Sequence, residues 1–176
     1  MKSPEECALE RVKWLLAHGA TVAAELATRG GENDLWGGTS LHTAAEQGSL
    51  SVLDALLSAD GALALESFDD ISQTPLACAA QAGQLEAARR LLAAGADPNA
   101  NEEAKAGVTP LYRAVEGRHE ELVILLLEHG ADPEIRGWMN LNALDETEDW
   151  AESRKPELRR IHALLRDPRR RRVRAR

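Results

Sequence analysis

Apolar and polar positions follow a pattern that recurs three times, thirty-five residues apart. The chain reads TSLHTAAEQG from Thr39, TPLACAAQAG from Thr74 and TPLYRAVEGR from Thr109. Each copy is followed by a leucine-rich stretch that closes on a glycine-alanine pair: LLSADGA, LLAAGADPNA and LLLEHGADPE. A fixed period of this length is typical of a solenoid, in which one supersecondary unit is stacked repeatedly.

Each copy predicts two short helices. In the second copy, Thr74 is a suitable cap and Pro75 suits the first helical position. Gly83 can end this helix with a positive φ. Leucines and alanines over residues 85–93 recur at the spacing of one helix face, which predicts a second helix before Gly95. The unit is therefore a helix-turn-helix with a turn leading to the next copy.

This pattern resembles the ankyrin repeat, whose hallmark is T-P-L-H-x-A, a helix pair and a GAD turn. The resemblance implies an all-α ankyrin-repeat solenoid of stacked helix-turn-helix units with short β-turn or hairpin-like loops. It also implies that His42, at the histidine of the motif, ties neighbouring loops together by hydrogen bonds.

Two degraded copies flank the three clear ones. LERVKWLLAHGA, from Leu9, matches a second helix, and Ser3 and Glu6 predict a capping box before it. GWMNLNALDE, from Gly137, resembles the start of a repeat with Asn140 where proline should stand. We expect a single ankyrin-repeat domain over 1–166, made of a degenerate N-terminal cap repeat with a long connector (1–36), full repeats (37–70, 71–106 and 107–136) and a degenerate C-terminal cap repeat (137–166), followed by a disordered arginine-rich tail (167–176).

Charge is divided unevenly along the chain. Residues 1–165 hold 14 Lys/Arg against 28 Asp/Glu, a net of −14, whereas residues 166–176 hold 7 Arg against 1 Asp, a net of +6. An acidic body favours a partner with a basic surface and disfavours nucleic acid and anionic membranes. The tail could bind nucleic-acid phosphates in a salt-sensitive way, which is the alternative function.

The sequence offers no recognisable catalytic chemistry. It contains no Gly-rich phosphate loop, HExxH or G-x-S-x-G motif, and its two cysteines, Cys7 and Cys78, form no zinc-binding pair. No apolar run is long enough to cross a bilayer, and the acidic N-terminus is unlike an export signal. We expect a cytoplasmic, monomeric protein that is not an enzyme, binds no cofactor or metal and keeps both thiols reduced.

The tryptophans and the repeated histidines have different interpretations. We expect Trp14 in the core and Trp36 on the surface, while Trp138 could pack on a neighbouring loop or serve as a binding anchor. Trp150 is expected to pin the acidic segment down. His18 and His129 both precede the glycine that closes a helix, where a partial cation is favourable.

The function implied by the resemblance is protein–protein recognition through the concave face of loops and inner helices. An inhibitor or an immunity-type neutraliser of one partner is a specialised form of that function. Carried over from the family, the expected contact residues are Asp34, Trp36, Thr43, Glu46, Gln47, Ile71, Gln73, Cys78, Gln81, Lys105, Val108, Arg113, Glu116, Arg136 and Trp138.

Overall fold

The computed structural model describes residues 3–17, 38–59, 64–102, 107–137, 140–152 and 155–167. Within these ranges the regular structure is helical, with no strand. The elements in chain order are α1 (Pro4–Ala17), α2 (Ser40–Gln47), α3 (Leu50–Ala59), α4 (Pro75–Gln81), α5 (Leu85–Ala93), α6 (Pro110–Glu116), α7 (Glu120–Glu128), α8 (Ala143–Glu146), the 3-10 helix η5 (Glu148–Glu152) and α9 (Pro156–Arg166).

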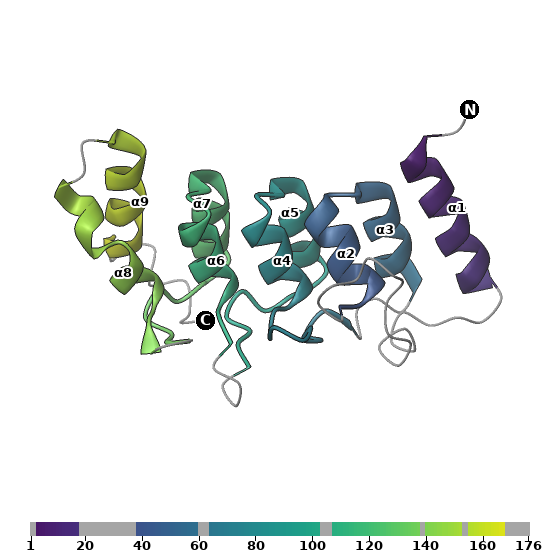
Figure 1. The fold of residues 1–176 in the computed structure, drawn as a ribbon, viewed down its shortest axis with the longest axis horizontal. Coiled ribbons are helices and arrows are strands. Elements are labelled where there is room, and N and C mark those ends of the chain that lie inside the picture. Colours follow the sequence, from purple (N-terminus) through teal and green to yellow (C-terminus); the bar gives the residue numbers. More distant parts are fainter. Residues whose placement is uncertain are drawn as a thin grey trace.

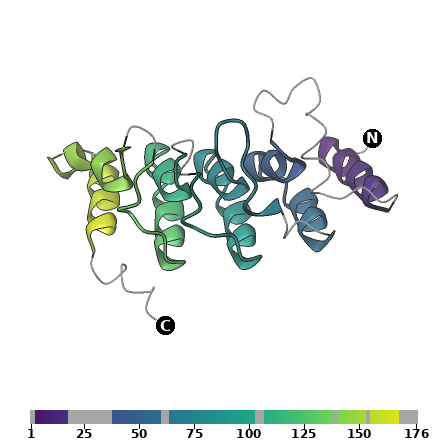
Figure 2. The ribbon, with the colours of Figure 1, turned by 90° about the horizontal axis from the view of Figure 1, so that it is seen from below.

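The helices stack in two parallel rows (Figures 1 and 2). The first helices of the copies, α2, α4, α6 and α8, pack side by side in the inner row. The second helices, α3, α5 and α7, form the outer row, which α1 and α9 extend at its two ends. Each inner helix also packs on the outer helix that follows it. The predicted all-α solenoid is therefore confirmed.

The repeated threonines begin the inner helices. Thr39, Thr74 and Thr109 adopt extended backbone conformations, and each hydroxyl accepts backbone N–H groups of the first helical turn. These bonds satisfy donors that an isolated helix start would leave unpaired. Pro75 and Pro110 then occupy the first turn, where a missing N–H is harmless.

The core is built from positions that hardly change between copies. Leu41, Leu76 and Leu111 are fully buried at equivalent positions of α2, α4 and α6. Small residues three and four positions later are also buried, so the inner helices can approach closely: Ala44 and Ala45, Ala79 and Ala80, and Ala114 and Val115. Burying each leucine stabilises the fold by about 1.5–3 kcal/mol.

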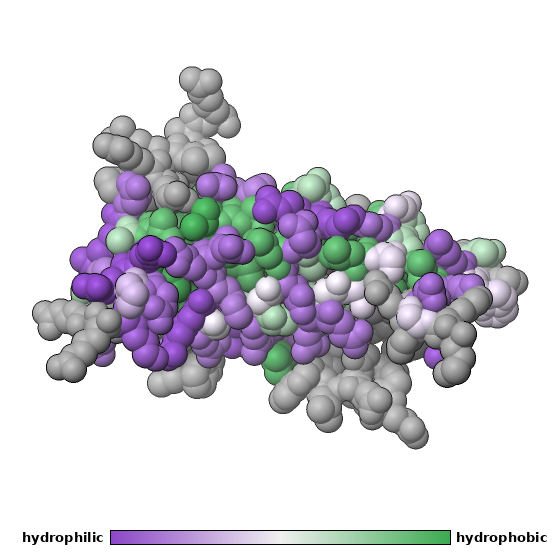
Figure 3. Space-filling model, turned by 90° about the horizontal axis from the view of Figure 1, so that it is seen from above, coloured by the Kyte–Doolittle hydropathy of each residue, from purple (hydrophilic) through white to green (hydrophobic). Residues whose placement is uncertain are grey.

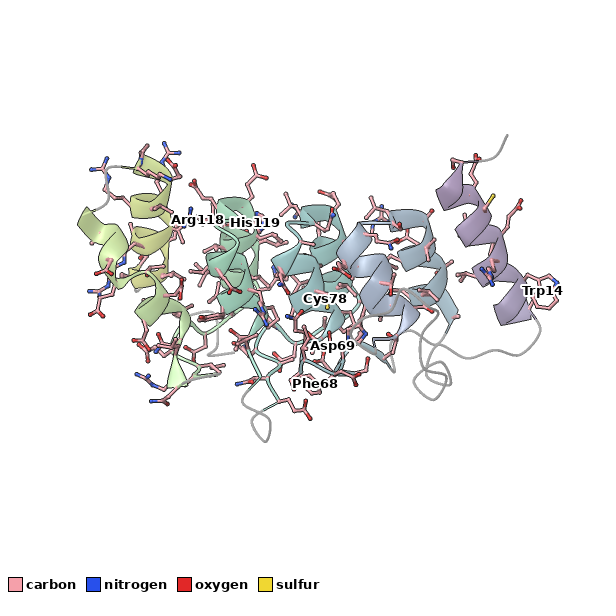
Figure 4. The ribbon with its side chains drawn as sticks, in the orientation of Figure 1. Trp14, Phe68, Asp69, Cys78, Arg118 and His119 are labelled. Carbon is pink, nitrogen blue, oxygen red and sulfur yellow. The ribbon has the colours of Figure 1, made fainter. Side chains whose placement is uncertain are left out.

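Helix α1 begins as predicted, but its tryptophan does not lie in the core. Ser3 N donates to Glu6 Oε2 at 2.7 Å and Glu6 N donates to Ser3 Oγ at 3.1 Å, which confirms the capping box. Leu9 and Val12 pack against the core, whereas Trp14 is 60% exposed (Figure 4). The prediction for Trp14 was wrong because α1 packs on α3 along one side only, and Trp14 lies about 140° around the helix from Leu9.

The degenerate C-terminal copy starts three residues later than the sequence comparison indicated. Asn142 is the cap of α8, and its side chain accepts from Asp145 N at 2.8 Å. Asp145 Oδ2 accepts from Asn142 N at 3.2 Å and completes a capping box. Ala143 therefore holds the proline position, and Asn140 lies in the preceding turn with a positive φ of 60°. Helices α8 and η5 occupy the acidic segment.

Hydrogen bonds join consecutive copies at both ends of the inner helices. His42 Nδ1 accepts the N–H of Thr39, so its Nε2 carries the proton that is donated to the carbonyl of Gln73 at 3.0 Å. The predicted tying role of His42 is confirmed. At the other end, Gln84 Nε2 donates to the carbonyl of Glu46 at 3.2 Å, and His119 Nε2 lies 3.3 Å from the carbonyl of Gln81.

The turns that follow the outer helices are joined in the same way. Asn99 Nδ2 donates to the carbonyl of Gly130 at 3.0 Å, and its Oδ1 accepts the N–H of Asp132 at 2.7 Å. His129 is the C-cap of α7, and its Nδ1 lies 2.9 Å from the carbonyl of Leu125, which also accepts the backbone N–H of His129 at 3.2 Å. The repeats thus form one bonded stack.

Candidate binding surface

The inner helices are exposed mainly at their C-terminal turns. In α2, α4 and α6 the equivalent residues Glu46, Gln81 and Glu116 are exposed, whereas the turns before them are largely buried. We use the name inner-helix face for the surface formed by Thr43, Glu46, Gln47, Gln81, Tyr112, Arg113, Glu116 and Glu146. On the side of the molecule shown in Figure 3, hydrophilic residues line both rims, with a hydrophobic band between them.

A rigid loop before α4 presents an apolar side chain beside this face. The Asp69 carboxylate is buried, and its Oδ1 accepts the N–H of Ile71 at 3.0 Å and of Gln73 at 2.8 Å. Asp69 N donates in turn to the carbonyl of Gln73 at 3.0 Å. Ile71 at the tip is 38% exposed, and Ser72 has a positive φ of 62°. Figure 4 shows Asp69 below Cys78 of α4, at the loop end of the helix row.

Gln73 lies at the centre of a polar network that crosses two repeats. A guanidinium only donates, so the Gln73 amide oxygen must face Arg113, where it accepts from Nη2 at 2.7 Å and Nε at 3.0 Å. In this orientation the amide nitrogen donates to Gln81 Oε1 at 3.0 Å. Arg113 Nη1 also donates to Glu116 Oε2 at 2.8 Å. One buried side chain therefore holds two surface residues in place.

Three of the expected contact residues are buried, which corrects the sequence-based list. Gln73, Cys78 and Val108 are 1%, 8% and 6% exposed. Gln73 supports Gln81 and Arg113 from beneath, and Val108 belongs to the segment directly before α6. Cys78 Sγ donates to Asp69 Oδ2 at 3.8 Å. Burial, followed by the negative charges of Asp69 and Glu46, raises the pKa of the Cys78 thiol far above its ordinary value.

Tyr112 and Glu146 belong to the face, although the contact list did not include them. Tyr112 Oη donates to Glu146 Oε2 at 3.3 Å and so joins α6 to α8. Partial burial raises the pKa of Tyr112, and the carboxylates of Glu146 and Glu116 raise it further. The sequence motif could have indicated Tyr112. It occupies the position that His42 holds in the first copy, and His42 links its copy to the next one.

The structure places the other expected residues in several environments. Thr43 is half-buried, Gln47 is exposed, and Arg136 is exposed with its Nη1 3.1 Å from Asp145 Oδ2. The predictions for Asp34, Trp36, Lys105 and Trp138 fall outside the described residues, as do those for His18 and for the Trp150 side chain.

The described residues were compared with two other kinds of site, a metal centre and a membrane span. They contain no group of three or more His, Cys, Asp or Glu side chains that could hold a metal ion. In the same ranges, no helix has both the length and the apolar character needed to cross a bilayer. Cys7 is an exposed thiol and Cys78 a buried one, with no disulfide between them.

Comparison with known proteins identifies the repeat. The sequence pattern of ankyrin repeats (3 copies) matches residues 4–102 and 68–137. The chain belongs to the ankyrin repeat family. A solved ankyrin repeat domain from Acinetobacter baumannii AYE shares 27% identity and superposes with a TM-score of 0.71, covering 89% of this chain and 74% of that one. No curated protein matches the chain.

Family membership sets the general role. Ankyrin repeats are generally protein–protein interaction modules and are typically non-enzymatic. In the described part of this ankyrin repeat chain, the inner row presents the side chains of the inner-helix face and the Ile71 loop.

Proposed function

We propose that this chain binds a partner protein through the inner-helix face and the Ile71 loop, and that it is not an enzyme. One observation carries the proposal: equivalent positions are alike where they are buried and different where they are exposed. Leu41, which is buried, recurs as Leu76 and Leu111, whereas the exposed Gln47 is replaced by Ala82 and then by Gly117. Stacking thus constrains the core and leaves the face free to specialise.

The rigidity of the face supports this role. Gln73 holds Arg113 and Gln81, Asp69 holds the loop that carries Ile71, and hydrogen bonds join each copy to the next. Immobilising a flexible polar side chain on binding costs about 0.5–1.5 kcal/mol, so side chains already fixed in the free protein retain that free energy.

Site-specific crosslinking tests the proposal. A photoreactive amino acid replaces Gln81 on the inner-helix face or, as a matched control, Arg89, which is exposed on α5. Irradiation in cell extract followed by mass spectrometry should give one discrete crosslinked protein from position 81 and none of that mass from position 89. Equal yields from both positions, or crosslinking from position 89 alone, would contradict binding through the inner row.

Narrower roles stay predictions. An inhibitor or an immunity-type neutraliser is one form of such binding, and the rigid face is compatible with it. The alternative, nucleic-acid binding by the arginine-rich tail, concerns residues 167–176, of which the structure describes Asp167 alone. The monomeric state and the cytoplasmic location likewise stay predictions.

A further inference from the structure

The exposed C-terminal turns of the inner helices carry a row of side-chain oxygens. Glu46, Gln81 and Glu116 are thirty-five residues apart, occupy the same place in α2, α4 and α6, and are all exposed. Because the three helices pack side by side, neighbouring members of this Glu–Gln–Glu row are separated by about one helix diameter, roughly 10 Å.

The carboxylates of this row stand where helix electrostatics disfavours them. The C-terminal end of a helix is the negative end of its dipole, so cations are favoured there and anions are not. Helix α2 has no basic residue in its last turn, and no described residue forms an ion pair with the Glu46 carboxylate. Glu116 has local compensation from Arg113. A residue that is unfavourable for its local structure, and that no described neighbour compensates, is expected at functional positions. Glu46 is such a residue.

The surroundings of the row are also acidic. The helices α2, α4, α6 and α8 carry Glu46, Glu116, Asp145 and Glu146 against one cation, Arg113, a net of −3. When the flanking residues Asp69, Asp70, Arg118 and Arg136 are counted as well, the net charge stays at −3. The Arg113 guanidinium is engaged by Glu116 and by the Gln73 amide, and the Arg136 guanidinium by Asp145. Negative potential therefore dominates the face, and a cationic partner is its electrostatic complement.

We infer that the partner presents lysine or arginine side chains to the Glu–Gln–Glu row, with Glu46 as the principal contact. This inference rests on the proposed function and names the partner's chemistry. A segment in the polyproline II conformation has three residues per turn and rises about 3.1 Å per residue, so cations at every third residue lie on one face, about 9 Å apart, and match the spacing of the row. The segment meets carboxylates at Glu46 and Glu116 and an amide at Gln81.

A peptide titration tests the inference on the full-length protein. The probe is a synthetic peptide with arginine at every third position in a serine background. The control peptide carries citrulline, which has the same shape without the charge, at the same positions. The arginine peptide should shift the amide resonances of the last turns of α2, α4 and α6, and its affinity should fall as sodium chloride is raised, since exposed ion pairs are screened.

Matched variants locate the contact. The double variant Glu46→Gln with Glu116→Gln should weaken peptide binding about fivefold, because each exposed ion pair contributes modestly. Glu86→Gln with Glu121→Gln removes the same charge from exposed positions of α5 and α7 and should leave the affinity unchanged. Equal binding of the citrulline peptide, or equal loss in both double variants, would overturn the inference.

Two further outcomes distinguish a failure of this inference from a failure of the proposed function. If Glu46→Gln alone shifts resonances of residues 169–176 in the free protein, the row is occupied by the chain's own tail, and the inference of a basic partner fails. If crosslinking at position 81 captures a protein whose affinity is unaffected by the Glu46→Gln and Glu116→Gln pair, this inference fails while the proposed function stands. A failed crosslink at position 81 would instead remove the proposed function itself.

Discussion

Replacing Asp69 with alanine should destabilise the protein by about 3 kcal/mol. The buried carboxylate accepts two backbone N–H groups, from Ile71 at 3.0 Å and Gln73 at 2.8 Å. A hydrogen bond to a charged group contributes about 1.5–3 kcal/mol net. Gln73 is buried, so its N–H would be left without a partner, whereas water can replace part of the bond at the exposed Ile71 tip. We therefore count about 2 and 1 kcal/mol for the two bonds.

Urea unfolding followed by circular dichroism measures this loss. With a slope of about 2 kcal/mol per molar urea, the midpoint of Asp69→Ala should fall by roughly 1.5 M. Asp69→Asn keeps the accepting Oδ1 atom and should lose about 1 kcal/mol. Asp70→Ala, at the exposed neighbouring position, should stay within about 0.5 kcal/mol of the wild type. An unchanged midpoint for Asp69→Ala, or an equal fall for Asp70→Ala, would refute the role given to the carboxylate.

Three further results are expected. Arg118 has a positive φ of 60°, so Arg118→Gly should raise the free energy of unfolding by about 1 kcal/mol, and Arg118→Ala, which also removes the charge, should not. The exposed Cys7 should react at once with Ellman's reagent and the buried Cys78 only after unfolding; a single fast phase that survives Cys7→Ser would contradict this. Partial burial raises the pKa of Glu66 above its ordinary 4.5, so the folded state holds this proton more tightly than the unfolded state does. Stability from this group is full below pH 4.5 and is lost as the pH rises through the folded pKa, so urea unfolding should show Glu66→Gln gaining on the wild type between pH 4 and pH 7.

Sequence periodicity was sufficient for the features that stacking imposes. The threonine caps, the proline starts and the buried leucines recur with the same period as the contacts they make, so one copy predicts the next. The cross-copy bond of His42 followed from its place in the family motif. Periodicity was less informative at the ends, where a helix has one neighbour instead of two. Trp14 is exposed for that reason, although it belongs to a stretch that matches a buried second helix.

The expected contact list erred where position was taken as a guide to exposure. Cys78 and Gln73 occupy places that the family leaves free for contacts, yet here both are buried, Gln73 against Gln81 and Arg113 and Cys78 against Asp69. Whether such a side chain lies on the surface or under it depends on the size and polarity of neighbours in the next copy. The long Arg113 side chain covers Gln73 and donates to it, a relation between residues forty positions apart that no single-copy pattern contains.

That relation explains how a repetitive core can support a specific surface. The leucines and alanines of α2, α4 and α6 set the spacing of the helices and make each copy interchangeable with the next. Specific character enters where a polar side chain bonds across copies, as Gln73 does with Arg113 and Tyr112 does with Glu146. Each such bond takes up hydrogen-bonding capacity that would otherwise be open to a partner. Glu46 remains with its carboxylate in no described ion pair, and an incoming cation would therefore gain most there, at the N-terminal end of the Glu–Gln–Glu row.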